Sequence, residues 1–461
     1  MYLKEKNVNN ILILFLFIHL LIWTVLPSLV NNNLPLDTIE ALAWGGDLEW
    51  GYYKHPPLSA WVVEFFYQGF GNQDWVYYFV SQLFVVSTFF IIFKFSEDFF
   101  ENKILSLISI LLLEGIYFYN FTTTEFNVNI CQLPFWALTV HYCWKGFKDN
   151  NNFSWIAFGV FAGLGVLSKY LFFYLLIGLA IFIIYNVIKK KINYLFLISI
   201  ISFLLVITLH LTWLINNDFT TIRYALWRSA TINSDFMNHI YNPIIFITKQ
   251  IGILIPFFIM VFLIIKKFKI KINYTDKKTL FLIVINILPI LFMFLTSLLT
   301  GAKIKTMWMT PFYLFIGVFI IYVFKNSLNL KKINNLFLTF LFLFVLSPFL
   351  YYLSSSFYSN SKMEITGSNY PGKKVAKIVQ MQWDKNFSDT IKIVVGRGWT
   401  NEWYAGNLSY NLDSRPKWKM KIDNYNLSGT IWIQGLNTIN YCKGVLYQIQ
   451  SLHDICMVGK K

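Results

Sequence analysis

The chain has 461 residues, of which 56% are hydrophobic and 20% aromatic, whereas only 13% are charged. This balance excludes an ordinary soluble globular domain, in which about a quarter of the residues are charged, and it predicts an integral membrane protein. The formal net charge is +16, but most lysines stand in short clusters between apolar runs. No basic patch with interleaved aromatic residues is present, so nucleic-acid binding is not expected.

Apolar runs long enough to cross a bilayer recur along the first three quarters of the chain. Because a membrane-spanning helix needs about 20 such residues, we predict eleven spans, near 10–30, 75–95, 104–121, 126–144, 153–168, 171–188, 193–213, 243–265, 279–300, 307–324 and 333–353. Only "SKY" separates 153–168 from 171–188, which leaves open one long bent helix or a hairpin of two. The first run ends without a small-residue cleavage pattern, so we expect a retained anchor.

The basic residues are distributed unequally over alternate loops. One set of loops carries most of the lysines, and the other set holds only Lys54, Lys169, Arg223, Arg228, Lys303 and Lys305. Because lysine-rich loops stay in the cytoplasm, the N-terminus is expected inside. The segments then expected outside are the first outer loop, 31–74, the loops 214–242 and 301–306, and everything after about 354.

The last hundred residues differ in character from the rest. "TIKIVV", "GTIWIQG" and "GVLYQIQ" read as short strands, and "NEWYAGNLSYNL" reads as a helix. We therefore predict two domains, a helical transmembrane domain over 1–354 and a small extramembrane α/β domain over 355–461. Cys442 and Cys456 suit a disulfide in an oxidising compartment, and two free thiols fit the sequence equally well.

Acids gather in the first outer loop, in "LDTIEALAWGGDLEWGYYKHPPLSAW" at 36–61. Asp37 and Glu40 are three residues apart, so on a helix their Cβ atoms lie about 5–6 Å apart on one face. Two carboxylates at that distance can share a proton or hold a cation. The alternative for Asp37 is helix capping, because it follows Pro35 at the start of a helical run.

The two prolines of "KHPPL" fix the backbone, so they hold Lys54 and His55 at a defined depth before the next helix. Either side chain can donate to a phosphate. The alternative for Lys54 is an interfacial lysine that extends its ammonium to water beside aromatic residues.

Further charged residues are expected at the same face. Arg223 suits phosphate because a guanidinium binds two oxygens at once, and Lys249 lies inside the run 243–265, where a lysine needs an anionic partner or water unless it reaches the interface. The other candidates are Asp218 and Lys303 on outer loops and Glu125 in the short turn "TTTEF".

Acids that face cations above an apolar bundle suit transfer of a sugar from a lipid phosphate. The cations stabilise the leaving phosphate, and a carboxylate takes the proton of the attacking alcohol or amine. No P-loop or G-x-G-x-x-G pattern points to a soluble nucleotide. The alternatives are a flippase or transporter of a lipid-linked sugar, for which no internal repeat is found, and a non-catalytic scaffold of envelope assembly.

At these residues the sequence resembles the GT-C type lipid-phosphate-sugar glycosyltransferases. In particular it resembles the bacterial aminoarabinose and galacturonic acid transferases of lipid A and their relatives, the protein O-mannosyltransferases. The resemblance covers most of the chain. It rests on the loop at 36–61 and, in order, on "GLGVLSKY" at 163–170, "WLINNDFTTIRY" at 213–224, "KIKTMWMTPFY" at 303–313 and "EWYAGNLSYNLDSRP" at 402–416.

The resemblance implies a GT-C fold and an inverting transfer from a polyprenyl-phosphate sugar at the outer face of a bacterial inner membrane. The implied acceptor is a lipid or glycan of the envelope, such as lipid A or its core or a polysaccharide, or a protein. The implied location is multi-pass, with the catalytic loops and the C-terminal domain in the periplasm. No cofactor is required by the family, and a divalent metal held by Asp37 and Glu125 is compatible with it.

The resemblance also assigns expected roles to single residues. Asp37 occupies the position of the functional acid, where many members carry adjacent Asp and Glu; here Glu40 is the candidate for the second acid. In the aminoarabinose transferases a lysine directly before the prolines looks like a ligand of the donor phosphate, whereas here His55 stands there and Lys54 precedes it. Glu125 resembles the acid of the second outer loop.

Overall fold

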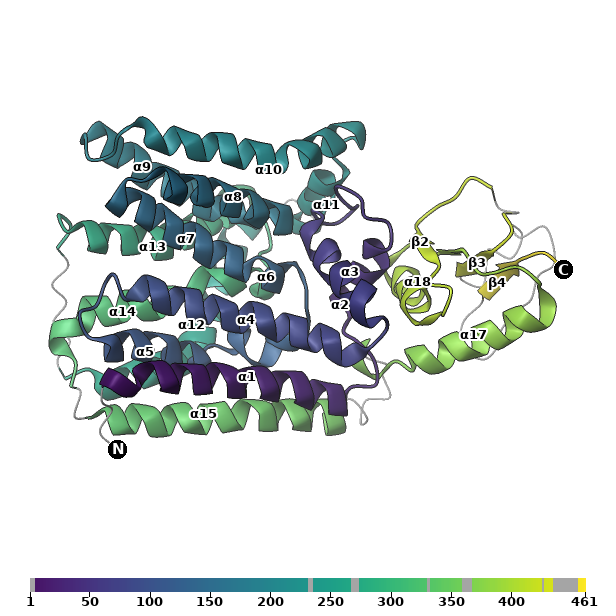
Figure 1. The fold of residues 1–461 in the computed structure, drawn as a ribbon, viewed down its shortest axis with the longest axis horizontal. Coiled ribbons are helices and arrows are strands. Elements are labelled where there is room, and N and C mark those ends of the chain that lie inside the picture. Colours follow the sequence, from purple (N-terminus) through teal and green to yellow (C-terminus); the bar gives the residue numbers. More distant parts are fainter. Residues whose placement is uncertain are drawn as a thin grey trace.

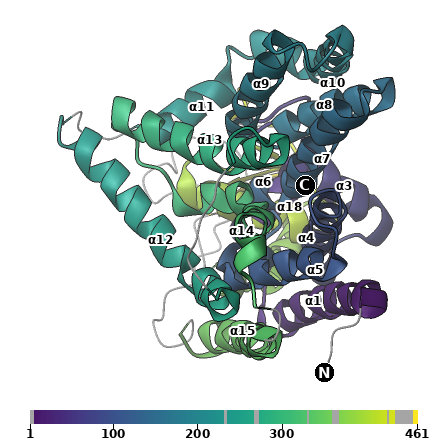
Figure 2. The ribbon, with the colours of Figure 1, turned by 90° about the vertical axis from the view of Figure 1, so that its left-hand side faces the viewer.

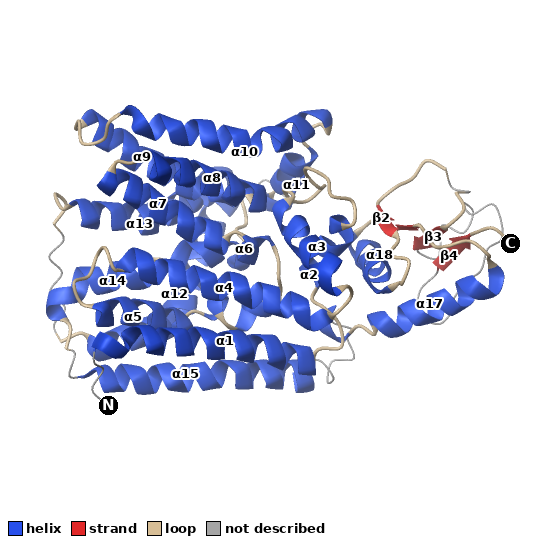
Figure 3. Cartoon of the chain, in the orientation of Figure 1, coloured by secondary structure: helices blue, strands red, loops and turns tan. Residues whose placement is uncertain are grey.

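The computed structural model describes residues 5–230, 235–266, 273–329, 332–358, 367–424, 427–433 and 455–461. These residues form a long helical bundle with a smaller α/β domain at one end (Figure 1). Helices dominate the fold and the few strands are confined to the smaller domain (Figure 3). The expected fold class, a polytopic helical membrane protein with a C-terminal α/β domain, is therefore confirmed.

Each of the eleven predicted spans overlaps a helix of the bundle. Within the described residues these helices are α1 (Val8–Val30), α4 (Asp74–Ser96), α5 (Lys103–Leu111), α7 (Leu133–Asp149), α8 (Asn152–Ser168), α9 (Phe173–Ile188), α10 (Leu197–Asn216), α12 (Asn238–Ile264), α13 (Lys277–Thr300), α14 (Ile316–Phe324) and α15 (Ile333–Leu353). Seen along the bundle, α1 and α15 lie at one edge and α9 and α10 at the opposite edge (Figure 2).

Length and composition alone qualify fewer of these helices as membrane spans. Among the described residues, seven helices are long and apolar enough, or up to nine if each of two bent helix pairs is one span. The expected spans that do not meet this criterion are α7 and α8, with 17 residues each. Both are packed against other helices of the bundle. α7 contacts α4 and α8, and α8 also contacts α10.

Small residues allow several of these helices to approach closely. A Cβ atom on Gly159 of α8 would lie 2.1 Å from the carbonyl oxygen of Ser199 in α10, and one on Gly317 of α14 would lie 2.1 Å from that of Ser109 in α5. Helix packing inside membranes uses glycine in this way, because dispersion contacts replace the hydrophobic effect as the source of stability.

Two of the expected spans are broken. The chain bends by 97° between Lys103–Gly115 and Tyr117–Thr124, and by 50° between Thr306–Tyr313 and Ile316–Ser327. The first break gives three 3-10 helices, η2 (Leu112–Gly115), η3 (Tyr117–Tyr119) and η4 (Phe121–Thr124), and the second follows η7 (Thr306–Tyr313).

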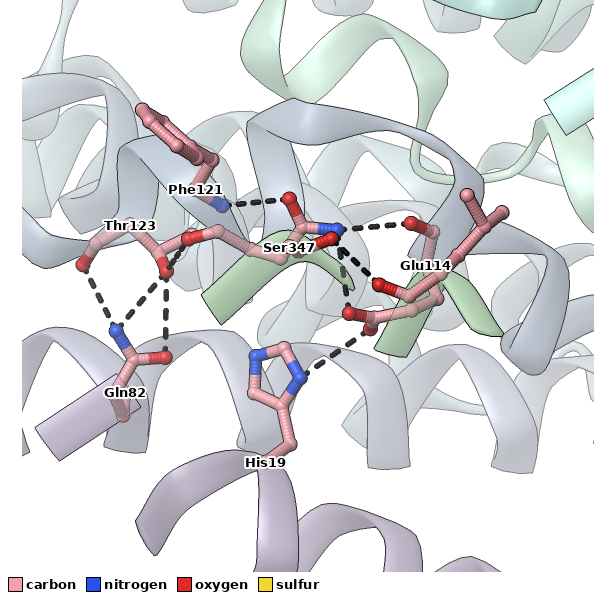
Figure 4. Close-up of polar contacts among 8 residues, drawn as sticks. His19, Gln82, Glu114, Phe121, Thr123 and Ser347 are labelled. Carbon is pink, nitrogen blue, oxygen red and sulfur yellow. Dashed lines mark hydrogen bonds and ion pairs between the residues drawn. The ribbon is translucent and has the colours of Figure 1, made fainter. Parts of the chain in front are cut away.

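Buried polar side chains satisfy the backbone of the first broken segment (Figure 4). Asn120 Nδ2 donates to the Glu114 carbonyl (2.8 Å), Thr123 Oγ1 donates to the Asn120 carbonyl (2.6 Å), and Gln82 Nε2 of α4 donates to the Thr123 carbonyl (2.9 Å). His19 of α1 lies 3.4 Å from Glu114 Oε2. Irregular backbone is tolerated at membrane depth where protein groups replace water in this way.

The segment 153–188 is two helices. Lys169, between α8 and α9, is extended (φ −164°, ψ 136°), and a short 3-10 helix, η5 (Tyr170–Phe172), leads into α9. The two helices also pack on different partners: α8 packs on α10, whereas α9 packs on α13.

Four shorter helices cover the end of the bundle next to the α/β domain. They are α2 (Leu36–Gly45), α3 (Leu58–Phe70), α6 (Val128–Cys131) and α11 (Thr220–Ser229). We call this the site end. The opposite end of the bundle is rich in lysine, and there Asp98 pairs with Lys145 (3.3 Å) and Lys148 (2.9 Å).

The C-terminal domain contains α17 (Gly372–Asn386), α18 (Trp399–Asn411) and a four-stranded sheet in the order β2 (Lys417–Lys419), β1 (Ile393–Val395), β3 (Thr430–Ile433), β4 (Ile455–Val458). β1 runs parallel to β2 and β3, and β4 is antiparallel to β3. The predictions for "TIKIVV", "GTIWIQG" and the helix of "NEWYAGNLSYNL" correspond to β1, β3 and α18. "GVLYQIQ" and Cys442 lie outside the described residues.

Candidate active site

A cavity of about 630 Å³ lies at the site end, between the bundle and α18. Its ionisable lining comes from six separate segments of the chain and comprises Asp37, Glu40, Lys54, His55, Lys169, Arg228, Lys305 and Glu402. Its apolar lining includes Leu171, Leu226, Met293, Met307 and Trp308. One cavity therefore joins a charged compartment to an apolar one.

The N-terminus of α2 is held by an acid from the broken span. Pro35 stands at the N-cap, where it offers no side-chain hydrogen bond, and Asp37 lies in the first turn of the helix. Instead the Asp37 main-chain N–H donates to Glu125 Oε1 (2.9 Å), and Thr38 Oγ1 donates to the Phe126 carbonyl (3.0 Å). Glu125 thus takes over the capping role, and the carboxylate of Asp37 is left to line the cavity.

Burial dominates the titration of the acids at the cavity. It raises the pKa of Asp37, against the opposing effect of the cations Lys54 and Lys169. Burial raises the pKa of Glu40 to about 7, with Lys54 opposing and Asp37 reinforcing the shift. Burial, reinforced by Asp37, raises the pKa of Glu125 to about 8. Glu40 and Glu125 therefore exchange protons near neutral pH, and the pKa of Asp37 is shifted in the same direction.

Lys54 is bound on two sides by carboxylates. Its Nζ pairs with Glu40, and it lies 2.8 Å from Glu402 Oε2 of α18. Burial lowers the pKa of Lys54, but the two carboxylates outweigh burial and hold that pKa above its ordinary value. Lys54 is therefore a permanent cation at the cavity.

His55 stands between aromatic rings, with centroids 6.1 Å from Trp44 and 6.4 Å from Tyr224. Burial, followed by the charges of Lys169 and Lys54, lowers the pKa of His55 to about 3. The imidazole is therefore neutral at physiological pH. It can donate one hydrogen bond to a ligand, but it adds no positive charge for a phosphate.

Lys169 lines the cavity; from the sequence it was expected on an outer loop, within "GLGVLSKY", but not at the site. The extended backbone between α8 and α9 directs its Nζ to Asn129 Oδ1 and over the Trp308 ring, 5.5 Å from the centroid. Burial lowers the pKa of Lys169 to about 7, against the opposing effect of Asp37. Its charge therefore depends on the anion opposite.

Two further cations were missed in the same way, Arg228 of α11 and Lys305 before η7. Burial lowers the pKa of Lys305, and Arg228, Lys303 and Lys249 lower it further. Arg228 and Lys305 thus lie at this wall of the cavity, and Lys249 and Lys303 are near enough to act on Lys305 through their charge. Such a cluster favours an anionic ligand.

Several selected residues stand away from the cavity. Arg223, Lys249, Lys303 and Asp218 are exposed and do not line it. Arg223 and Arg228 are five residues apart on α11, which places them on different faces of the helix, and only Arg228 faces the cavity. Lys249 and Lys303 affect the cavity only indirectly, because their positive charges lower the pKa of Lys305.

The α/β domain is attached to the first outer loop by ion pairs of which the acids, Glu64 and Asp47, are the more buried partners. Arg415 pairs with Glu64, with Nη1 2.9 Å from Oε1, and its guanidinium lies 3.4 Å from the centroid of the Tyr67 ring. Lys417 and Lys419 both pair with Asp47. These contacts fix α18, which brings Glu402 to the cavity.

The residues near Asp37 supply few ligands for a divalent metal. Asp37 and Glu125 offer two carboxylates, and in the described part of the chain no three His, Cys, Asp or Glu side chains are grouped to hold an ion. The ammonium groups of Lys54 and Lys169 act on the Asp37 carboxylate. Asp37 and Glu125 would thus supply two carboxylate ligands to a divalent metal held there.

Comparisons with known proteins bear on the fold. A family of dolichyl-phosphate-mannose-protein mannosyltransferases matches residues 54–213. The crystal structure of ArnT from Cupriavidus metallidurans bound to undecaprenyl phosphate is similar, with 12% identity, a TM-score of 0.59, and coverage of 87% of this chain and 85% of that one. The apo ArnT structure gives 10% identity and a TM-score of 0.58, with coverage of 88% and 85%. No curated sequence matched.

These likenesses establish the fold. The chain has the architecture of the GT-C glycosyltransferase ArnT over most of both chains, so the resemblance inferred from sequence motifs is confirmed at the level of the fold. The mannosyltransferase match covers Lys54, His55 and Lys169 but not Asp37.

Proposed function

We propose that the protein is an inverting glycosyltransferase that moves a sugar from a polyprenyl-phosphate donor to an acceptor of the cell envelope. The observation that carries the proposal is the composition of the cavity. Carboxylates with raised pKa values face a set of cations, and the same cavity continues into an apolar lining. A lipid phosphate that carries a sugar has matching parts: an apolar tail, an anionic link and a polar group.

In this proposal the cations bind the leaving group. Lys54, Arg228 and Lys305 lie around the phosphate, and neutral His55 donates a hydrogen bond to it. Positive groups aimed at developing charge are the largest single source of catalysis in such sites. When the bond between the anomeric carbon and the phosphate oxygen breaks, the electron pair moves to the phosphate, which these residues stabilise.

Asp37 is proposed as the general base. The acceptor's hydroxyl or amine attacks the anomeric carbon from the side opposite the phosphate, and its proton passes to the Asp37 carboxylate. The new bond forms as the old one breaks, which inverts the configuration. Burial raises the pKa of Asp37 toward the range in which a general base works best, and Glu40 and Glu125 are the neighbouring acids.

The proposed location is a bacterial inner membrane with the site end outside. The lysine-rich end of the bundle would face the cytoplasm, because lysine-rich loops stay there. The site end would then meet acceptors such as lipid A, its core, a polysaccharide or a protein. This follows from the charge difference between the two ends of the bundle.

The test is transfer by the purified protein in lipid nanodiscs. Radiolabelled polyprenyl-phosphate sugars are supplied with lipid, glycan and peptide acceptors, and labelled product is measured. We expect product from wild type and from Asp413→Asn, which removes an exposed acid of the C-terminal domain, and none from Asp37→Asn. In proteoliposomes, movement of the labelled lipid between leaflets without product would establish a flippase instead.

A further inference from the structure

A carboxylate of the C-terminal domain lies where the phosphate of a donor would be bound. Glu402 Oε2 is 2.8 Å from Lys54 Nζ, and the Lys54 side chain is only 10% exposed. Glu40 holds the same ammonium from α2. Lys54 therefore faces two carboxylates before any donor enters.

The position of Glu402 is fixed by close packing of α18 on α2. Gly406 is four residues after Glu402, so both lie on one face of α18, and both line the cavity. A Cβ atom on Gly406 would lie 3.2 Å from Ile39 Cγ2. Because α18 approaches α2 this closely, Glu402 reaches across the cavity wall to Lys54.

We infer that Glu402 competes with the donor phosphate for Lys54, so that the C-terminal domain sets how tightly the lipid phosphate is held. This inference rests on the proposed function. An ammonium with two carboxylate partners is already neutralised, so a phosphate must displace one of them to form its own charge-assisted hydrogen bond. Glu402 is the partner that can be displaced, because Glu40 lies on α2 beside the base.

The same competition assists the end of the reaction. Transfer leaves a phosphate monoester on the lipid, which carries more negative charge than the diester and binds cations more strongly. Return of Glu402 to Lys54 offers the ammonium an alternative partner as the monoester departs. Product release limits the turnover of many enzymes, so a residue that speeds release raises kcat at some cost in affinity.

The first test is binding of polyprenyl phosphate without sugar to the full-length protein in nanodiscs. Glu402→Gln keeps the shape of the side chain and removes its charge. We expect this variant to bind about tenfold more tightly than wild type, the size of one charge-assisted hydrogen bond. Asp384→Asn, which removes an exposed acid on α17 of the same domain, should bind like wild type.

A double-mutant cycle assigns the effect to Lys54. In a Lys54→Gln background, Glu402→Gln should no longer increase affinity, because the shared partner is gone. In transfer assays Glu402→Gln should lower both the KM for donor and kcat. If Glu402 had a purely structural role, Glu402→Gln would instead weaken binding of the lipid phosphate and raise the KM for donor.

Two failures are distinguishable. If wild type binds polyprenyl phosphate no better than the uncharged polyprenol and transfers no sugar, the proposed function is wrong. If wild type binds and transfers, but folded Glu402→Gln binds equally or more weakly, only the competition is wrong. Glu402→Asp, with a carboxylate one methylene shorter, applies the same test should Glu402→Gln not fold.

Discussion

The main-chain N–H of Asp37 donates a 2.9 Å hydrogen bond to Glu125 Oε1, although 88 residues separate the two in the chain. This contact joins the first turn of α2 to the end of the broken span. It places the two acids side by side. Because Glu125 accepts the main-chain N–H at the start of α2, the Asp37 side chain is not needed as a helix cap and faces the cavity. The position of the proposed base, Asp37, therefore depends on Glu125 in the turn "TTTEF".

Glu125→Gln tests that dependence. The amide oxygen of Gln still accepts the Asp37 N–H, so the fold should be retained, but the titratable carboxyl group next to Asp37 is lost. We expect transfer to fall about a hundredfold, the lower range for removing acid–base assistance, with an apparent melting temperature at neutral pH no lower than that of wild type. The readout is kcat in the nanodisc assay. Glu49→Gln, an exposed acid of the same outer loop, is the control, and wild-type kcat in Glu125→Gln would contradict the paired-acid arrangement.

The pH dependence of transfer provides a second prediction. An ordinary carboxylate base would be fully active from about pH 5 upward. Here burial raises the pKa of Asp37 and lifts the pKa of Glu40 to about 7, so activity requires loss of a proton near neutrality. We expect kcat/KM for the donor to rise between pH 6 and pH 8. A flat profile over this range would show that no acid with a raised pKa limits the reaction.

The same raised pKa values predict how stability changes with pH. Burial raises the pKa of Glu125 from an ordinary 4.5 to about 8, so between these values the folded state holds a proton that the unfolded state has released. Stability from this group is then present at low pH and decreases as pH rises toward 8. The apparent melting temperature should fall over this interval in wild type, and less steeply in Glu125→Gln.

The spans were predictable because 20 apolar residues in a row are a local signal. The break after Gly115 was not, because its irregular backbone depends on partners distant in sequence: Gln82 donates to the Thr123 carbonyl from α4, and His19 approaches Glu114 from α1. Such long-range compensation leaves no periodic pattern. For the same reason, "SKY" could not be assigned as a bend or a turn.

For the site, the sequence identified acids and cations more reliably than it identified which of them face the cavity. Asp37, Glu40 and Lys54 follow from one short proline-anchored segment, where local geometry decides. The choice between Arg223 and Arg228 depends on the rotation of α11 against α2, which is a tertiary property. Glu402 comes from a separate domain, and only the packing of α18 brings it to Lys54.

Lys169→Met tests the missed cation through opposite effects on activity and stability. Burial lowers the pKa of Lys169 to about 7, so the folded state has to release a proton that the unfolded state keeps, which destabilises the protein at neutral pH. Met fills the same space without that cost. We expect an apparent melting temperature a few degrees higher and transfer at least about tenfold slower.

The control for Lys169→Met is Lys303→Met, which removes an exposed cation near the same cavity. It should leave the melting temperature unchanged and alter transfer by less than Lys169→Met does. If Lys169→Met proves less stable than wild type and fully active, Lys169 is a structural lysine rather than part of the site.

Arg415→Lys tests whether the C-terminal domain is a part of the active site. Arg415 binds Glu64 with two nitrogens, stacks on the Tyr67 ring and donates to the Leu42 carbonyl (3.3 Å), a geometry that a lysine cannot reproduce. The loss of this partly buried pairing should cost about 2 kcal/mol of docking free energy. Because Arg415 has a left-handed backbone (φ +44°), Arg415→Lys preserves the backbone cost and isolates the side chain.

Freed from Glu64, the domain should expose its junction with the bundle. Limited proteolysis should then cut Arg415→Lys after α15 faster than wild type, and kcat should fall because Glu402 and Trp403 no longer line the cavity. Arg397→Lys, an exposed arginine of the same domain, should behave as wild type in both assays. Faster proteolysis with undiminished kcat would instead show that the bundle alone performs transfer and that the domain only covers it.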